Sequence, residues 1–207
     1  MGSLTLMAAL VLAPAAGAGT VSTAFETLTF TAPMVETNQV NVDLSGPDYV
    51  ITDDGAAVTA GFGCVSVTPD RATCSATGIE TVQLSLGPGG DTADFGAAIP
   101  AEVRTVAFGE AGDDQLTAAP NSGTNLYGGD GADLLTGGDS RDSLSGGEGP
   151  DRLDGGAGSD SIQPGPGDDI AAGGTGGDYF QAEPVADGAD RFRGGPGLDS
   201  LIYQNRT

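Results

Sequence analysis

From residue 109 onward, apolar side chains recur every nine residues. The clearest units are GGDGADLLT (128–136), GGDSRDSLS (137–145), GGEGPDRLD (146–154) and GGAGSDSIQ (155–163). Each unit ends in a triplet long enough for a minimal strand with one side chain pointing inward. The glycines before the triplet allow tight turns with positive φ. The pattern predicts short strands joined by turns, so that every second unit, 18 residues on, stacks on the same edge.

The repeat continues beyond these four units and covers residues 109–202. The further units are GEAGDDQLT (109–117), APNSGTNLY (119–127), PGPGDDIAA (164–172), GGTGGDYFQ (173–181), VADGADRFR (185–193) and GGPGLDSLI (194–202). A weaker unit, LGPGGDTAD (86–94), places Asp91 at the aspartate position. Residues 182–184 are an insertion that breaks the sequence register, and this departure weakens metal coordination across it.

The apolar position of the repeat predicts a narrow core between two parallel sheets. It is filled by Leu135, Leu144, Leu153, Ile162 and Phe180. Ala171 fills the same position poorly. Because one unit buries a single side chain, it cannot fold alone, and stability must come from stacking on neighbours.

Residues 19–108 are patterned as short strands without the nine-residue period. Strands are expected at 25–30, 38–44, 48–52, 79–86 and 103–108, where apolar and polar residues alternate. This region is either a β-rich cap or the irregular first coils of the same solenoid. We therefore expect an all-β protein, a parallel β-roll or β-solenoid of nine-residue repeats preceded by a β-rich N-terminal cap region.

Cys64 and Cys74 are the two cysteines of the chain, and they flank a hairpin-like segment. In a secreted chain this arrangement predicts one structural disulfide within the N-terminal region. The loop is short, so the stabilisation is about 2–3 kcal/mol. Two thiols without histidine are too few ligands for a zinc site.

Residues 1–18 have the pattern of a secretory signal peptide. A short apolar run at 4–12 precedes the small residues Ala16-Gly17-Ala18, although no basic residue stands before the run. An apolar first strand or a misplaced start codon are the alternatives. No later stretch is apolar enough to span a membrane. Residues 203–207 form a short C-terminal tail, which leaves open whether the chain is a fragment.

Composition narrows the classes of function. The chain has 29 acidic residues, seven arginines and no lysine, giving a net charge of −22, which disfavours nucleic acid as a partner. Histidine is absent, which excludes histidine-based triads and histidine metal sites. The 36 glycines and 12 prolines would by themselves suggest disorder, but their periodicity argues for a repeat fold. We therefore expect no enzymatic activity.

The aspartate of each unit indicates a cation. Stacking every second unit places Asp133, Asp151 and Asp169 on one edge, with the equivalent residues of the other units on the opposite edge. Layers about 4.8 Å apart bring these carboxylates close enough to repel one another. A hard divalent ion between the layers turns this repulsion into attraction, and several carboxylate and carbonyl oxygens suit Ca²⁺ better than Mg²⁺.

The nonapeptide Gly-Gly-x-Gly-x-Asp-x-apolar-x resembles the hemolysin-type, or RTX, calcium-binding repeat family. The resemblance implies that several Ca²⁺ ions bind through the aspartates and backbone carbonyls. The implied aspartate ligands are Asp114, Asp133, Asp142, Asp151, Asp160, Asp169, Asp178, Asp190 and Asp199. The implied carbonyl ligands are those of Gly128, Gly129, Gly131, Gly146, Gly147, Gly149, Gly155, Gly156 and Gly158. Three departures weaken individual sites: Thr124 replaces Asp, Ser140 replaces the third Gly and Pro164 replaces the first Gly.

These observations predict a secreted, extracellular calcium-binding protein that folds when Ca²⁺ binds outside the cell. One alternative is a surface adhesin or matrix component in which Ca²⁺ only rigidifies the repeats and an unidentified partner is bound. A second alternative is an accessory module of a hydrolase. The sequence does not distinguish the secreted calcium-binding protein from the surface adhesin or matrix component.

Overall fold

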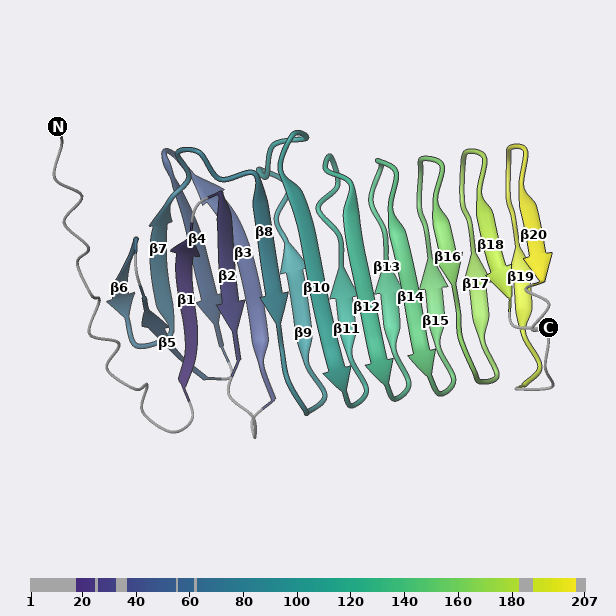
Figure 1. Ribbon diagram of the computed structural model, residues 1–207, viewed down its shortest axis with the longest axis horizontal. Coiled ribbons are helices and arrows are strands. Elements are labelled where there is room, and N and C mark those ends of the chain that lie inside the picture. The colour runs from purple at the N-terminus through teal and green to yellow at the C-terminus, as the bar shows by residue number, and fades with distance from the viewer. Residues whose placement is uncertain are drawn as a thin grey trace, which may run out of the picture.

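The computed structural model describes residues 18–24, 26–32, 37–54, 56–61, 63–182 and 188–203 as an elongated solenoid of two facing β-sheets (Figure 1). Sheet A contains, in spatial order, β20 (Ser200–Tyr203), β18 (Tyr179–Ala182), β16 (Ser161–Gln163), β14 (Ser143–Glu148), β12 (Thr124–Asp130), β10 (Arg104–Ala111), β8 (Thr81–Ser85), β2 (Thr27–Thr31), β1 (Ala18–Ala24) and β5 (Ala57–Ala60). Sheet B contains β19 (Arg191–Arg193), β17 (Ile170–Ala172), β15 (Arg152–Asp154), β13 (Leu134–Thr136), β11 (Gln115–Thr117), β9 (Thr92–Phe95), β3 (Gln39–Ser45), β4 (Asp48–Asp53), β7 (Arg71–Ser75) and β6 (Cys64–Thr68).

The repeat region forms the parallel solenoid that the nine-residue period predicts. Successive units alternate between the sheets, and strands two units apart pair in parallel. Leu135 of β13 is opposite Leu153 of β15, and Leu144 of β14 is opposite Ile162 of β16. These registers confirm the predicted all-β class and the stacking of every second unit.

The strands remain paired in register across the insertion at 182–184. Ile170 of β17 pairs with Arg191 of β19, and Tyr179 of β18 pairs with Ser200 of β20. β18 ends at Ala182, the first inserted residue, and β19 begins at Arg191. Strand register therefore survives, because only the connecting segment is longer.

The core is a single row of side chains from each sheet, as the apolar position predicts. Its fully buried members in the repeats are Leu116, Leu126, Leu135, Leu144, Leu153, Ile162, Ala171 and Phe180. Near the last coil, the Phe180 and Phe192 rings meet edge to face with centroids 5.6 Å apart. Ala171 is also buried, although it presents only a methyl group at this position.

The stacking continues on the N-terminal side of the repeats. β10 pairs in parallel with β8 and β8 with β2 in sheet A, while β11 pairs with β9 and β9 with β3 in sheet B. β1, β4, β6 and β7 add antiparallel pairings at this end. The N-terminal region thus combines irregular coils of the solenoid with an antiparallel cap, the two interpretations that the sequence leaves open.

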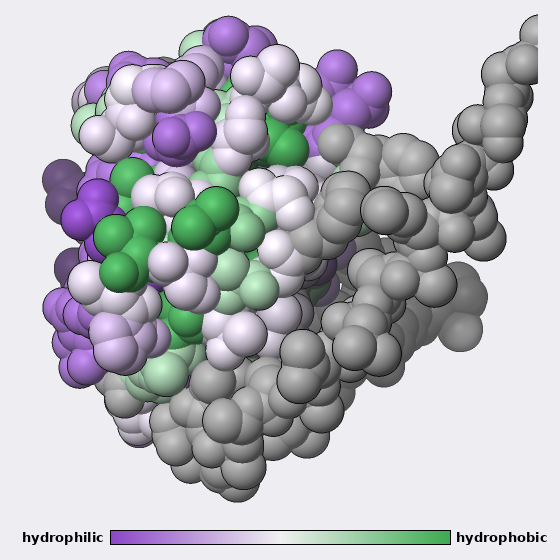
Figure 2. Space-filling model, turned by 90° about the vertical axis from the view of Figure 1, so that its left-hand side faces the viewer, coloured by the Kyte–Doolittle hydropathy of each residue, from purple (hydrophilic) through white to green (hydrophobic). Residues whose placement is uncertain are grey.

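The cap closes one end of the solenoid. A disulfide joins Cys64 and Cys74 at facing positions of β6 and β7. Figure 2 looks onto this end, where hydrophobic side chains gather between polar ones, and Val65 and Val67 of β6 are exposed. The predicted signal peptide falls almost wholly outside the described residues, as do residues 204–207. Among the described residues, no helix has the length and apolar character needed to cross a bilayer.

Shortening one core side chain tests the stacking. We expect Leu144→Ala to lower the free energy of unfolding by about 2–5 kcal/mol, because Leu144 is 1% exposed and the cavity cannot close between fixed strands. Leu198→Ala, at a residue 91% exposed, is the control and should change little. The measurement is denaturant unfolding of both variants in calcium. Equal stability of the two variants would contradict the packing described.

Candidate metal centre

The repeat aspartates stand in two columns, one along each edge of the solenoid, joined by hydrogen bonds between coils. In the first column the Asp133 N–H donates to Asp151 Oδ1 at 2.9 Å, and the Asp151 N–H donates to Asp169 Oδ1 at 2.8 Å. In the second column the Asp142 N–H donates to Asp160 Oδ1 at 2.8 Å. Each backbone amide is therefore satisfied by the carboxylate of the following coil on the same edge.

The columns extend along the whole repeat region. The first contains Asp91, Asp114, Asp133, Asp151, Asp169 and Asp190, and the second contains Asp142, Asp160, Asp178 and Asp199. Those up to Asp178 are at most 2% exposed, whereas Asp190 is half-buried and Asp199 is exposed in the last coil. The links to Asp190 and Asp199, at 3.2 Å and 3.0 Å, cross the insertion.

The second carboxylate oxygen, Oδ2, differs from Oδ1 in its hydrogen bonding. Oδ2 is buried and accepts no hydrogen bond in Asp91, Asp114, Asp133, Asp151, Asp160 and Asp178. A buried polar atom without a partner costs about 1–3 kcal/mol, and more when it is charged. A row of such atoms therefore calls for a ligand that accepts oxygen electron pairs.

Except in Asp91, each of these oxygens lies beside the first glycine of its own unit. A Cβ added at Gly155 would lie 2.5 Å from Asp160 Oδ2 and 2.6 Å from the Gly173 carbonyl oxygen of the next coil. At Gly128 the same position meets Asp133 Oδ2 and the Gly146 carbonyl oxygen. We call this space, which glycine leaves open between a carboxylate and a carbonyl oxygen, the oxygen cradle.

The cradle recurs along both edges. Gly109 faces Asp114 Oδ2 and the Gly128 carbonyl, and Gly146 faces Asp151 Oδ2 and the Pro164 carbonyl. Pro164 therefore still supplies a carbonyl to the preceding coil on its edge, although its own unit lacks the space that glycine leaves. The replacement weakens one cradle without removing its neighbour.

The later glycines of the unit serve the close stacking of the turns. Gly129 and Gly131 have φ of +121° and +145°, values that other residues rarely adopt. A Cβ at either would collide with a carbonyl oxygen of the preceding coil. The same holds for Gly147, Gly149, Gly156 and Gly158. These glycines allow the turns to pack layer on layer, which brings the carbonyl groups of successive coils together.

Comparison with known families identifies this pattern. Residues 127–162 match the model of the RTX calcium-binding nonapeptide repeat, in four copies. These residues are RTX repeats. Searches of curated proteins and of solved structures give no match to the chain. RTX repeats generally bind Ca²⁺, so Ca²⁺ is the ion to test against the residues present.

The donor set of the RTX repeats fits a hard cation. Every cradle offers a carboxylate and a carbonyl oxygen, the ligands that Ca²⁺ prefers. No group of three or more acidic, cysteine or histidine side chains that could hold a metal occurs among the described residues. Backbone carbonyls would have to complete the coordination, as the RTX resemblance implies for the predicted glycines.

Burial makes the acidic columns unfavourable without a cation. Burial, helped by neighbouring carboxylates and opposed by backbone N–H donors, raises the pKa of Asp114, Asp151 and Asp160 to about 7. Burial also raises the pKa of Asp91, Asp133 and Asp142. A proton or a metal ion therefore stabilises these groups in the folded protein.

Asp142 differs from the other repeat aspartates. Its Oδ1 accepts the Thr124 N–H at 2.7 Å, and its Oδ2 accepts the Gly138 N–H at 2.6 Å. Thr124, where an aspartate would stand, instead contacts Thr105 through their hydroxyl oxygens at 2.6 Å. The unit that contains Thr124 and the unit that contains Ser140 thus stack at the start of the second column. There Asp142 Oδ2 accepts a hydrogen bond, whereas in the other cradles Oδ2 accepts none.

Two buried acids at the N-terminal end lie outside the predicted ligand set. Asp91, which the weaker unit places at the aspartate position, accepts the Asn38 N–H at 2.6 Å and continues the first column. Asp53, the last residue of β4, is fully buried and accepts the Gln39 N–H at 2.9 Å. The Gly-Gly-Asp triplet at 89–91 was a usable signal for the first, whereas nothing periodic marks the second.

The raised pKa values predict how pH affects the calcium-free protein. Folded Asp151 and Asp160 bind protons up to pH about 7, whereas the unfolded chain releases them near the ordinary value of 3.8. The folded state therefore holds more protons between these values, and its free energy of unfolding falls as pH rises through this window. Thermal unfolding in chelator at pH 5 and pH 8 should show the higher midpoint at pH 5.

Asp151→Asn provides the matched test, because it removes one of these charges. The variant should lose less stability between pH 5 and pH 8 than the parent in chelator. Asp139→Asn, an equal change at an exposed side chain, should behave like the parent. A midpoint that rises with pH in chelator would contradict the burial of these carboxylates.

Proposed function

We propose that this protein is a secreted, non-enzymatic calcium-binding solenoid that folds when Ca²⁺ fills its repeat edges outside the cell. The observation that carries the proposal is the row of buried Oδ2 atoms, which in Asp114, Asp133, Asp151 and Asp160 lie beside a carbonyl oxygen in an oxygen cradle. The RTX repeats at residues 127–162 support Ca²⁺ as the ion.

The charge and chemistry of the columns favour Ca²⁺ over other metals. The donors are oxygens throughout, and both cysteines of the chain are in the Cys64–Cys74 disulfide, so no thiolate is offered to a softer metal. Mg²⁺ requires a stricter octahedral arrangement and keeps its water, whereas Ca²⁺ accepts a larger and more flexible set of oxygens. Recurring cradles along both columns support several ions per chain.

Folding coupled to ion binding follows from the energy balance of one coil. A unit buries one apolar side chain, such as Leu153, and also a carboxylate such as Asp151. At neutral pH the carboxylate opposes folding, because burial and its column neighbours both disfavour its charge. An ion that binds only the folded state contributes its binding free energy to folding.

Extracellular conditions suit such sites. Modules that work outside cells commonly bind Ca²⁺ with dissociation constants of about 10⁻⁴–10⁻³ M. The disulfide between Cys64 and Cys74 also suits an oxidising compartment. The chain contains no histidine, and the buried aspartates of the repeats are engaged in the columns, which supports a binding role without catalysis.

Calcium titration of the full chain tests the proposal. We expect circular dichroism to gain β signal, and calorimetry to show binding of several ions, as Ca²⁺ reaches millimolar concentration. Mg²⁺ at the same concentration should have a much smaller effect. Asp151→Asn should shift the titration to higher Ca²⁺ because it removes a charged ligand from its column, whereas exposed Asp139→Asn should follow the parent.

Two outcomes would overturn the proposal. One is an unchanged spectrum with no heat of binding in millimolar Ca²⁺. The other is reproducible turnover of ester, peptide or glycoside substrates by the calcium-loaded protein, which would replace the non-enzymatic role with a catalytic one.

A further inference from the structure

A polar hollow of about 450 Å³ lies on the outer side of sheet A and borders the second aspartate column at Asp142. Arg104 and Arg141 line it together with Gly123 between them. Asn125, Ser143 and Ser161 continue the lining along neighbouring strands. Apart from Asp142, none of these residues belongs to the ligand set that the RTX repeats imply.

Strand register explains why the two arginines line the same hollow. Thr105 pairs with Thr124, and Asn125 pairs with Ser143, so Arg104, Gly123 and Arg141 occupy equivalent positions in three successive coils. Arg104 and Arg141 are therefore two layers, about 9.6 Å, apart along the stack. Gly123 has no side chain to fill the middle layer, and the hollow is the space that it leaves.

The charge in this hollow is unusual for the molecule. The chain has seven basic residues against 29 acidic ones, yet two of the seven share this hollow with their side chains exposed. Within the described part of the chain, neither guanidinium group takes part in an ion pair or a side-chain hydrogen bond. Arg141 acts electrostatically on buried Asp160, and Arg104 also lines a neighbouring hollow with Glu80 and Glu102.

One acid, Asp142, also borders the hollow, but it does not neutralise the arginines. Its side chain is 2% exposed, and its two oxygens accept the backbone N–H groups of Thr124 and Gly138. Its charge is held by these donors at the edge of the solenoid.

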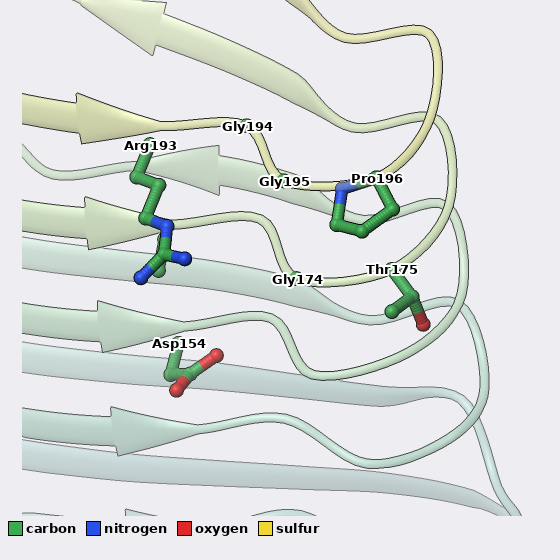
Figure 3. A pocket seen from close by; sticks show the side chains of 8 residues that line it. Asp154, Gly174, Thr175, Arg193, Gly194, Gly195 and Pro196 are labelled. Atoms are coloured by element: carbon green, nitrogen blue, oxygen red, sulfur yellow. The ribbon is translucent and has the colours of Figure 1, made fainter.

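A second hollow, lined by one arginine and one acid, provides a comparison for the arginine pair. On sheet B, small Ala172 leaves a space of about 220 Å³ between Asp154 and Arg193 (Figure 3). The register is equivalent, since Asp154 pairs with Ala172 and Ala172 with Arg193. Here an acid faces the arginine across the gap, so an anion gains nothing, whereas the Arg104–Arg141 gap has a cation on both sides.

We propose that the Arg104–Arg141 hollow binds an oxyanion group, a carboxylate, sulfate or phosphate, carried by a hydroxyl-rich ligand. Guanidinium groups donate paired hydrogen bonds to such oxyanions. Asn125, Ser143 and Ser161 lie in one register column beyond the arginines and offer an amide and two hydroxyls about 4.8 Å apart. This column suits ligand hydroxyl groups. The proposal requires the folded solenoid but not the proposed calcium function.

The test uses the full chain in calcium buffer, with sodium glucuronate, sodium sulfate and glucose as probes in calorimetric titrations. Glucuronate should bind, and neutral glucose should not. Arg104→Gln and Arg141→Gln should each weaken glucuronate binding about tenfold or more, because each loses a charge-assisted hydrogen bond. Arg152→Gln, an exposed arginine on sheet B, is the control and should bind as the parent does. Circular dichroism confirms that each variant folds.

The outcomes separate the parts of the proposal. Glucuronate binding that survives in both arginine variants would overturn the site and would point to the sugar acid reaching a metal ion instead. Absence of glucuronate binding by the folded parent would also overturn it. Tighter binding of glucuronate than of sulfate, reduced by Ser143→Ala, supports the hydroxyl column. Equal binding of glucuronate and sulfate would contradict a role for the hydroxyl column and leave a site for the oxyanion group alone.

Discussion

The hydrogen bond from each repeat aspartate N–H to the carboxylate of the following coil underlies the rest of the structure. It holds the turns in register, as between Asp133 and Asp151 at 2.9 Å, and it buries the carboxylate against the edge of the sheets. Because this bond uses Oδ1, the other oxygen is turned toward the first glycine of its unit. The geometry that stacks the coils thus also creates the cradles.

The same bond sets the electrostatic problem of the fold. Backbone donors lower the pKa of each carboxyl, but burial raises it more, and the column neighbours of Asp151 and Asp160 add to the rise. The coils therefore pack closely, but the negative charge of their buried carboxylates is not compensated within the stack. An ion in the cradles corrects the charge without changing the shape, which is why binding and folding belong to one equilibrium.

Sequence periodicity was enough to predict the parts that depend on stacking. Leu135, Leu144 and Ile162 are core residues, as the apolar position predicts. Asp133 and Asp142 lie on opposite edges, because successive nine-residue units alternate between the two sheets. The period could not predict β5 or the buried Asp53, since the strands of the cap lie outside the repeat and are positioned by tertiary contacts. The insertion at 182–184 lengthens the sequence between two strands without changing their pairing with the preceding coil. The paired arginines escaped notice because Arg104 and Arg141 lie 37 residues apart in sequence and meet only through strand register.

The ladder of hydrogen bonds also has a direction. Every amide donates toward the C-terminal neighbour on its edge, from Asn38 to Asp91 at one end and from Asp178 to Asp199 at the other. A completed coil thus presents oriented donors to the coil that follows it, and the next aspartate only has to dock on them. Order can spread along the molecule in the same sense as the polypeptide is made, each turn acting as a template for its successor.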